Sequence, residues 1–97
     1  MNSDPLITQC DTVAGLLKDL AHGQRLQMLC HLVGKERSVG ELMELCSTSQ
    51  SRVSQFLAQM RKDGLVAARR EGKFVFYRIE DPRIARLIRS LRTIFCP

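Results

Sequence analysis

Residues 38–66 constrain the fold more than any other stretch of the chain, because they read as two short helices separated by a tight turn. Ser38 and Glu41 match the S-x-x-E capping box, which opens a helix. A run of serine and threonine then predicts the turn, with Ser49 as the N-cap of the second helix and Gly64 as its stop. The first helix has an apolar face made of Val39, Leu42, Met43 and Cys46. The stretch therefore predicts a helix-turn-helix.

The second helix, at about residues 50–63, is the candidate recognition helix. Its inner face is an apolar stripe at i, i+3, i+4 and i+7, formed by Val53, Phe56, Leu57 and Met60. Its outer face carries hydroxyl, amide and ammonium groups, which hydrogen-bond base edges and phosphates in the major groove of DNA. A solvated surface helix also has a polar face, so this pattern needs support from its neighbours. The residues expected to contact DNA here are Ser49, Gln50, Ser51, Arg52, Ser54, Gln55, Gln59 and Lys62.

The period of the apolar residues changes after the glycine stop. Residues 65–70 and 74–79 read as two β-rich strands joined by a hairpin turn, which makes residues 65–79 a wing beside the helix-turn-helix. Arg69, Arg70 and Lys73 cluster at the hairpin tip, where a wing meets the sugar-phosphate backbone. An ordinary solvated hairpin tip would look the same if no helix-turn-helix preceded it. The aromatic residues of the second strand are expected to pack on the helices rather than stack on single-stranded bases; they are Phe74, Phe76 and Tyr77.

Amphipathic helices are predicted on both sides of this unit. Asp4 with Pro5, and Asp81 with Pro82, are helix-start signals. The first helix ends near residue 21, a second occupies about residues 24–34, and residues 35–37 form a solvated connector. The first and last helices offer more apolar surface than one small domain covers, so we expect them to pair across a dimer. Their apolar residues are Leu6, Cys10, Val13, Leu17 and Leu20 in the first helix, and Ile84, Leu87, Ile88, Leu91, Ile94 and Phe95 in the last.

The composition fits one domain over residues 1–97, mainly helical with a small hairpin. The net charge of +5 is compatible with a nucleic-acid partner but does not identify one. The chain has neither a signal-peptide pattern nor an apolar run of membrane-spanning length, so a cytoplasmic location and no membrane partner are expected. In that reducing compartment the four cysteines are expected to be free thiols, ligands or redox switches. Taken alone, Cys30 and Cys46 read as buried and inert, and Cys10 as part of the helix seam.

The sequence does not read as that of an enzyme or a metal protein. There is no C-x-x-C thiol site, Ser-His-Asp set or phosphate-binding glycine loop, so neither catalysis nor a cofactor is expected. The cysteines and histidines form no C-x-C, C-x-x-C or H-x-x-H pair, so no metal site is expected. His22 and His31 are better interpreted as helix-end and surface residues.

The order of elements and the segments QSRVSQFLAQMRKDGLV and REGKFVFYRI resemble the ArsR/SmtB family of dimeric bacterial repressors, over nearly the whole chain. The segments GQRLQMLCHLV and IRSLRTIFCP are more similar to its thiol-based, persulfide-sensing branch. That resemblance implies that Cys30 and Cys96 form a reversible disulfide or polysulfide switch, in place of the inert role for Cys30. The chain departs from the family at Phe56, where a histidine is common, and at Gly23, where a proline is usual. The cysteine pair and the histidines of the family's metal sensors are missing from the third and last helices.

These observations predict a transcription regulator that binds an inverted-repeat operator as a homodimer. Two recognition helices would enter successive major grooves about 34 Å apart. Reactive sulfur species or oxidants would link Cys30 to Cys96 and release a repressor from DNA. Two alternatives stay open: a metal-independent activator or antagonist that displaces another repressor, and a metal-responsive repressor.

Overall fold

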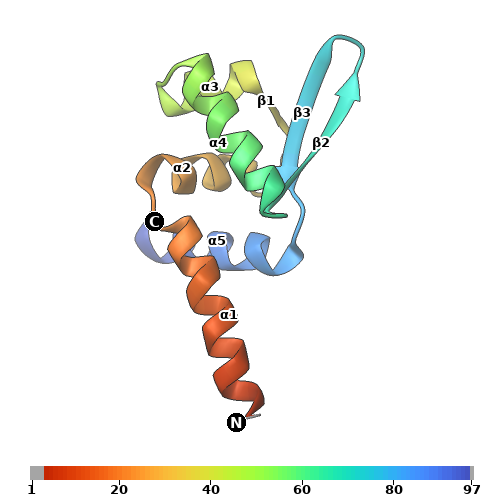
Figure 1. Ribbon diagram of the computed structural model, residues 1–97. Helices are drawn as coiled ribbons and strands as arrows, with labels where there is room; N and C mark the ends of the chain where they lie inside the picture. The colour runs from red at the N-terminus through yellow and green to blue at the C-terminus, as the bar shows by residue number, and fades with distance from the viewer. Residues whose placement is uncertain (1–3, 97) are drawn as a thin grey trace.

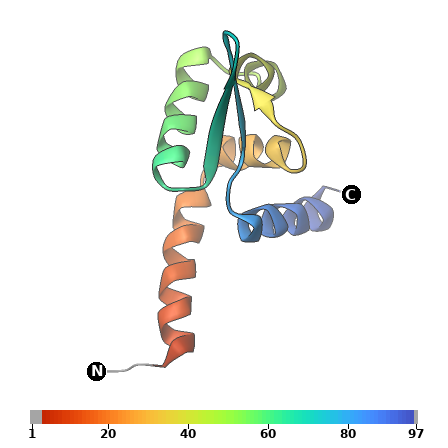
Figure 2. The same ribbon diagram turned by 90° about the vertical axis from the view of Figure 1, so that its right-hand side faces the viewer.

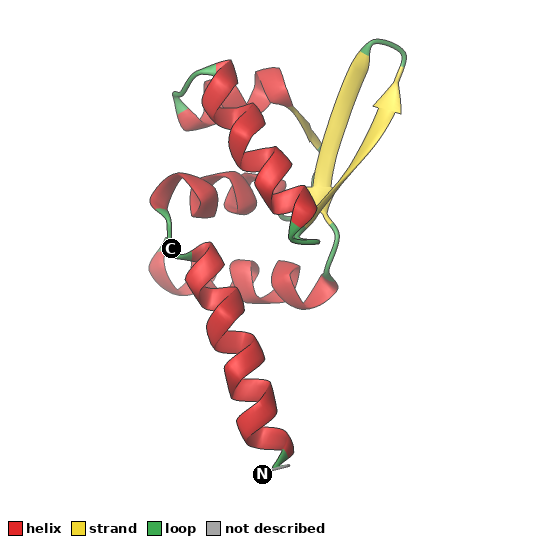
Figure 3. Ribbon diagram, in the orientation of Figure 1, coloured by secondary structure: helices red, strands yellow, loops and turns green. Residues whose placement is uncertain are grey.

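Each predicted helix start is visible in the computed structural model, which describes residues 4–96. Asp4 Oδ1 accepts a hydrogen bond from the Leu6 amide at 2.9 Å, and Asp81 Oδ1 accepts one from the Arg83 amide at 2.9 Å. Ser38 and Glu41 make both hydrogen bonds of the capping box. Each such cap contributes about 1 kcal/mol to helix stability. The described chain contains α1 (Pro5–Leu20), α2 (Gly23–Leu32), β1 (Arg37–Ser38), α3 (Val39–Cys46), α4 (Gln50–Lys62), β2 (Val66–Glu71), β3 (Phe74–Ile79) and α5 (Pro82–Phe95) (Figures 1 and 3).

The core lies between α2, α3, α4, α5 and the base of the hairpin. Its most deeply buried side chains are Met28, Leu29, Leu32, Leu42, Val53, Leu57, Met60, Ile84 and Ile88. Three of the four residues in the predicted inner stripe of the recognition helix are among them, and Phe56 is half-buried at the edge. Cys46 is buried in this core, as predicted. Truncating one such leucine to alanine would cost about 2–5 kcal/mol, so the core fixes where α4 stands.

The helix-turn-helix is formed by α3, a three-residue turn and α4. Ser47 turns the chain with a left-handed φ of 49°, and Ser49 caps α4 by accepting from the Arg52 amide at 3.2 Å. Gly64 has a φ of 78° just after α4, and the Leu65 amide donates back to the Met60 carbonyl at 2.9 Å. Glycine adopts this conformation without a Cβ clash, so the predicted stop is confirmed.

The sheet has three strands in the order β1-β3-β2, all antiparallel, rather than the two of a simple hairpin. β2 and β3 are joined by a two-residue turn in which Gly72 has a φ of 61°. β1 pairs Arg37 with Tyr77 and Ser38 with Phe76. The prediction of a solvated connector at residues 35–37 is therefore wrong for Arg37, which is half-buried and donates from Nε to the His31 carbonyl at 3.0 Å.

α1 projects away from the rest of the chain (Figures 1 and 2). Every residue from 4 to 15 is exposed, and only Leu20 at its end is buried. The predicted seam of α1 therefore has no cover within one chain. α2 and α5 lie side by side beneath the helix-turn-helix. Within residues 4–96 no helix is both long and apolar enough to cross a membrane.

Candidate nucleic-acid interface and thiol pair

The outer face of α4 is exposed along its length. All eight residues predicted to contact DNA from this helix and its cap are solvent-accessible. Two of them already have intramolecular partners, since the Ser49 hydroxyl caps the helix and the Gln59 amide donates to the Asp63 carboxylate at 3.3 Å. Within residues 4–96 no hydrogen bond occupies the side chains of Ser51, Ser54 and Gln55. The same holds for the side chains of Gln50, Arg52 and Lys62, so all six can make new hydrogen bonds to DNA.

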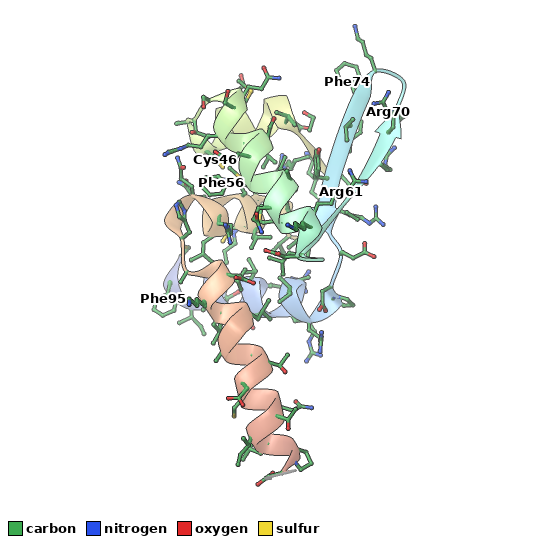
Figure 4. All side chains as sticks on the ribbon, viewed as in Figure 1. Cys46, Phe56, Arg61, Arg70, Phe74 and Phe95 are labelled. Carbon is green, nitrogen blue, oxygen red and sulfur yellow. The ribbon has the colours of Figure 1, made fainter. Side chains whose placement is uncertain are left out.

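Phe56 joins the recognition helix to the elbow between α1 and α2 (Figure 4). Its ring centroid lies 4.8 Å from that of His22, and the Arg25 guanidinium lies 5.7 Å from it. Arg25 Nη1 also donates to the Asp19 carbonyl at 2.5 Å, at the end of α1. The predicted inward position of Phe56 is thus confirmed, but its partners were not foreseen. The contact fixes α4 relative to the first helix.

The three predicted wing cations differ in their surroundings. Arg69 is held by two carboxylates, with its Nε 2.8 Å from Glu36 and its Nη1 2.8 Å from Glu71. The hydrogen bonds to Glu71 and Glu36 raise the pKa of Arg69, and the two carboxylates occupy its guanidinium. Arg70 and Lys73 lie nearer the hairpin tip, and within the described chain neither makes an ion pair. They are the wing cations available to phosphate.

The aromatic residues of β3 do not share one role. Tyr77 packs against the core, as predicted. Phe76 is half-buried beneath the Arg69 guanidinium, which lies 5.0 Å from its ring centroid. Phe74 is 54% exposed at the hairpin tip, so the prediction that it packs on the helices is wrong (Figure 4). The hairpin reaches beyond the helices at this end, which leaves the ring without a surface to cover.

Cys30 and Cys96 come together although they are far apart in the sequence. Cys30 is half-buried near the end of α2, and Cys96 is the exposed C-cap of α5. Both line the same two adjoining hollows, of about 340 and 300 Å³, and Leu26 and Arg92 line both as well. Both thiols are free. Cys30 packs against the edge of the core, close to the buried position predicted for it, and it also borders both hollows.

The other two thiols and the histidines lie apart from this pair. Cys10 is exposed on α1, and Cys46 is buried in the core. His22 occupies the N-cap position of α2, as predicted for a helix-end residue, but its side chain makes no capping hydrogen bond. His31 is half-buried rather than on the surface. Burial, with Arg37 and Arg92 nearby, lowers the pKa of His31. In the part of the chain that the structure describes, no three His, Cys, Asp or Glu residues are grouped to hold a metal ion.

Arg92 tunes the thiol of Cys30. Burial raises the pKa of Cys30, the positive charge of Arg92 lowers it in part, and a negative charge on Cys96 raises it. Arg92 Nη1 also donates to the Cys30 carbonyl at 3.2 Å. No role for Arg92 was predicted from the sequence. Its position four residues before Cys96, on the same side of α5, was the signal that could have identified it.

Replacing Arg92 by leucine is expected to raise the pKa of Cys30 further, because the favourable positive charge is lost while burial remains. Alkylation of Cys30 by iodoacetamide, followed by peptide mass spectrometry across a pH series, measures this. At neutral pH the rate should fall severalfold in R92L, since the thiolate is the reacting form. R92K keeps the charge and should stay near the wild-type rate. Equal rates in R92L and wild type at low salt would contradict the electrostatic role.

The order of elements defines the class of protein: α3 and α4 form a helix-turn-helix, and the hairpin that follows makes it a winged helix-turn-helix. Residues 22–68 match the family described as "Bacterial regulatory protein, arsR family". The chain is 41% identical over 96 residues to the biofilm growth-associated repressor of Xylella fastidiosa, covering 99% of this chain and 84% of that protein. The chain therefore belongs to the arsR family of bacterial regulatory proteins. It is a transcriptional regulator of a DNA-binding family rather than an enzyme.

Similarity extends to an activator and to a solved structure. The chain is 44% identical over 81 residues to the transcriptional activator HlyU of Vibrio cholerae, covering 84% of this chain and 75% of that protein. The crystal structure of the transcriptional regulator HlyU from Vibrio vulnificus has a TM-score of 0.92 and 38% identity, covering 99% of this chain and 100% of that one. The relatives thus include both a repressor and an activator.

Proposed function

We propose that the protein is a homodimeric regulator that binds an inverted-repeat operator in duplex DNA and loses affinity when reactive sulfur or another oxidant links Cys30 to Cys96. Its place of action is the cytoplasm, where the operator DNA lies. The observation that carries the proposal is the shared site of the two thiols, which border the same hollows beside Arg92. The reading of DNA rests on the exposed polar face of α4 and on the wing.

In the proposed complex with DNA, α4 and the wing have different tasks. Ser51, Ser54 and Gln55 hydrogen-bond base edges in the major groove, because their side chains are exposed and have no hydrogen-bond partner within residues 4–96. Arg70 and Lys73 contact phosphates and supply salt-dependent affinity. The remaining predicted residues position α4 on the DNA; they are Ser49, Gln50, Arg52, Gln59, Lys62 and Arg69.

The dimer part rests on where apolar surface is exposed. Six of the eight large hydrophobic residues that are exposed in the described chain lie on α1 and α5: Leu6, Ile7, Val13, Leu17, Ile94 and Phe95. A patch of this kind on a small domain marks an interaction site. A second copy is the natural occupant, because the same two helices of the partner present a matching apolar surface across a two-fold axis. The related domain Mb0332 of Mycobacterium bovis is described as homodimeric.

The redox part is a balanced two-electron oxidation. The Cys30 thiolate attacks the outer sulfur of an organic persulfide RSSH, forms Cys30–SSH and releases RS⁻. The Cys96 thiolate then attacks the inner sulfur, which forms the Cys30–Cys96 disulfide and releases HS⁻. The two thiols are oxidised and the persulfide is reduced to a thiol and sulfide. A direct disulfide needs Cα atoms within about 7 Å, whereas retained sulfur atoms bridge a wider gap. Either link would pull the end of α5 toward α2 and shift the dimer seam.

The second candidate function is a regulator that binds DNA and senses nothing. Its specific support is the activator HlyU of Vibrio cholerae among the relatives, since an activator can act by displacing a repressor. This candidate shares the operator binding and the dimer with the first. It differs in one measurable property, which is that its DNA affinity would be independent of the oxidation state.

One experiment tests the proposal and separates the two candidates. The reduced full chain selects its sites from a random pool of duplexes, and its affinity for the selected duplex is then measured before and after treatment with an organic persulfide. We expect a loss of affinity of about tenfold or more, the size of a typical allosteric coupling. Peptide mass spectrometry should place the disulfide, or added sulfur, at Cys30 and Cys96. Unchanged affinity would favour the second candidate, and no selected duplex would refute both.

A further inference from the structure

The wing tip carries an aromatic ring that has no structural partner in the core. Phe74 is the first residue of β3, directly after the hairpin turn. Its ring lies 6.4 Å from that of Phe76 and 5.6 Å from the Lys73 ammonium, whereas the core takes only Val66, Tyr77 and Ile79 from the hairpin. The large hydrophobic residues that are more exposed lie on α1 and α5, which the proposed dimer covers. Phe74 is therefore the most exposed large apolar side chain in the helix-turn-helix and the hairpin.

The charges around this ring fit a nucleic acid. Lys73 lies beside Phe74, and Arg70 lies across the turn, opposite Val75. Within residues 4–96 neither cation has a carboxylate partner, whereas the next cation toward the base, Arg69, has two. The tip therefore carries an apolar ring beside the Lys73 ammonium, and Arg70 lies one pair further along the ladder (Figure 4). Glu71 pairs directly with Phe74, but its carboxylate is held by the Arg69 guanidinium at 2.8 Å. The minor groove of DNA fits this tip. Rows of phosphates border the groove on both sides and can contact the cations, while its floor of bases and its walls of apolar deoxyribose can contact the ring.

The position of the hairpin supports this match. β2 begins four residues after α4 ends, and the hairpin rises from that end and projects past the helices (Figure 1). A recognition helix lying in the major groove therefore brings the hairpin tip to the neighbouring minor groove. Gly72 and Lys73 form a turn of two residues, so the tip is narrow enough to approach a groove about 6 Å wide.

We infer that Phe74 enters the minor groove beside the α4 site and makes the protein prefer A·T over G·C pairs there. This inference rests on the proposed function and adds to it a residue and a base preference that α4 does not provide. The preference follows from one group: guanine carries a 2-amino group on the floor of the minor groove, which takes the space of the ring and has no acceptor in it. Apolar side chains of other proteins also enter the minor groove, where they wedge between base steps.

The test uses the duplex that the wild-type chain selects from a random pool, remade with A·T, G·C or inosine·C pairs under the wing. Inosine·C keeps the major-groove groups of G·C but lacks the 2-amino group. Wild type should bind the A·T and inosine·C forms equally and the G·C form about tenfold more weakly, the usual cost of one unfavourable pair. F74T keeps a strand-forming residue and should bind all three forms equally. F74L keeps an apolar wedge and should retain the preference.

The control separates the ring from the charge beside it. K73Q should weaken binding to all three duplexes equally and reduce the slope of log affinity against log salt by about 1, whereas F74T should leave that slope unchanged. An unchanged A·T preference in F74T would overturn the inference. The inference would also be overturned if wild type bound the inosine·C duplex as weakly as the G·C duplex. The protein would then be reading groups in the major groove, which these two pairs share. Failure of wild type to select any duplex would instead overturn the proposed function.

Discussion

Replacing Leu17 by glutamate is expected to turn the protein into a monomer and to lower its affinity for an inverted-repeat duplex by about a hundredfold or more. Leu17 lies in the exposed apolar stripe of α1, and the proposed dimer buries that stripe against its own copy. A two-fold axis places two new carboxylates in the seam, one from each chain, and a buried charge without a partner costs several kcal/mol. The loss on DNA follows because two linked half-site contacts gain about 100- to 10,000-fold from effective concentration.

Sedimentation measures the oligomeric state, and fluorescence anisotropy measures binding to one half-site and to the full repeat. T12E is the matched control, since Thr12 is exposed on the opposite side of α1 and receives the same charge. It should remain dimeric and bind the full repeat as wild type does. If L17E stays dimeric while retaining full affinity, α1 is not the seam. Circular dichroism of both variants confirms that the helices have formed.

Replacing Cys30 by serine is expected to abolish the response of DNA binding to an organic persulfide while leaving the affinity of the reduced protein unchanged. Serine keeps the size and loses the nucleophile, and Cys30 lies away from α4 and from the wing. The measured quantity is the ratio of DNA affinities before and after treatment. This ratio should be about tenfold or more in wild type and 1 in C30S. C96S should behave alike, because one thiol alone cannot close the link.

The remaining cysteines provide the controls for this experiment. C10S removes the exposed thiol of α1, and C46A removes the buried thiol of α3 without leaving an unsatisfied hydroxyl in the core. Both should respond to the persulfide as wild type does. A normal response in C30S, or a response lost in C10S, would move the switch to another thiol. A response lost in C96S but kept in C30S would indicate modification of Cys96 alone.

Local signals accounted for most of the fold. Asp4, Ser38, Ser49 and Asp81 were recognisable as helix starts because a cap is decided by side chains within three residues of it. The glycine stop of α4 is local in the same sense. The apolar periodicity identified the inner face of α4, because three of its four stripe residues are buried. The class of protein therefore followed from short-range patterns.

Features that depend on distant partners were not predictable in the same way. β1 has two residues and cannot display an alternating pattern, so its pairing with β3 was missed. The ion pair between Arg69 and Glu36 depends on the pairing of β1 with β3, since Glu36 directly precedes β1. Phe74 was expected to pack because β3 is rich in aromatic residues, but packing depends on how far the hairpin extends beyond the helices. The pairing of Cys30 with Cys96 came from resemblance, not from spacing.

The short strand β1 has a consequence for how the chain folds. Ser38 is at once the partner of Phe76 in the sheet and the N-cap of α3. Its pairing closes a loop that contains α3, α4 and β2, so this contact forms only after the ends of a long segment have met. Fraying of β3 from β1 would strain the cap of α3 as well. The wing and the helix-turn-helix should therefore open and close as one cooperative unit, and not as a rigid head with a loosely attached arm.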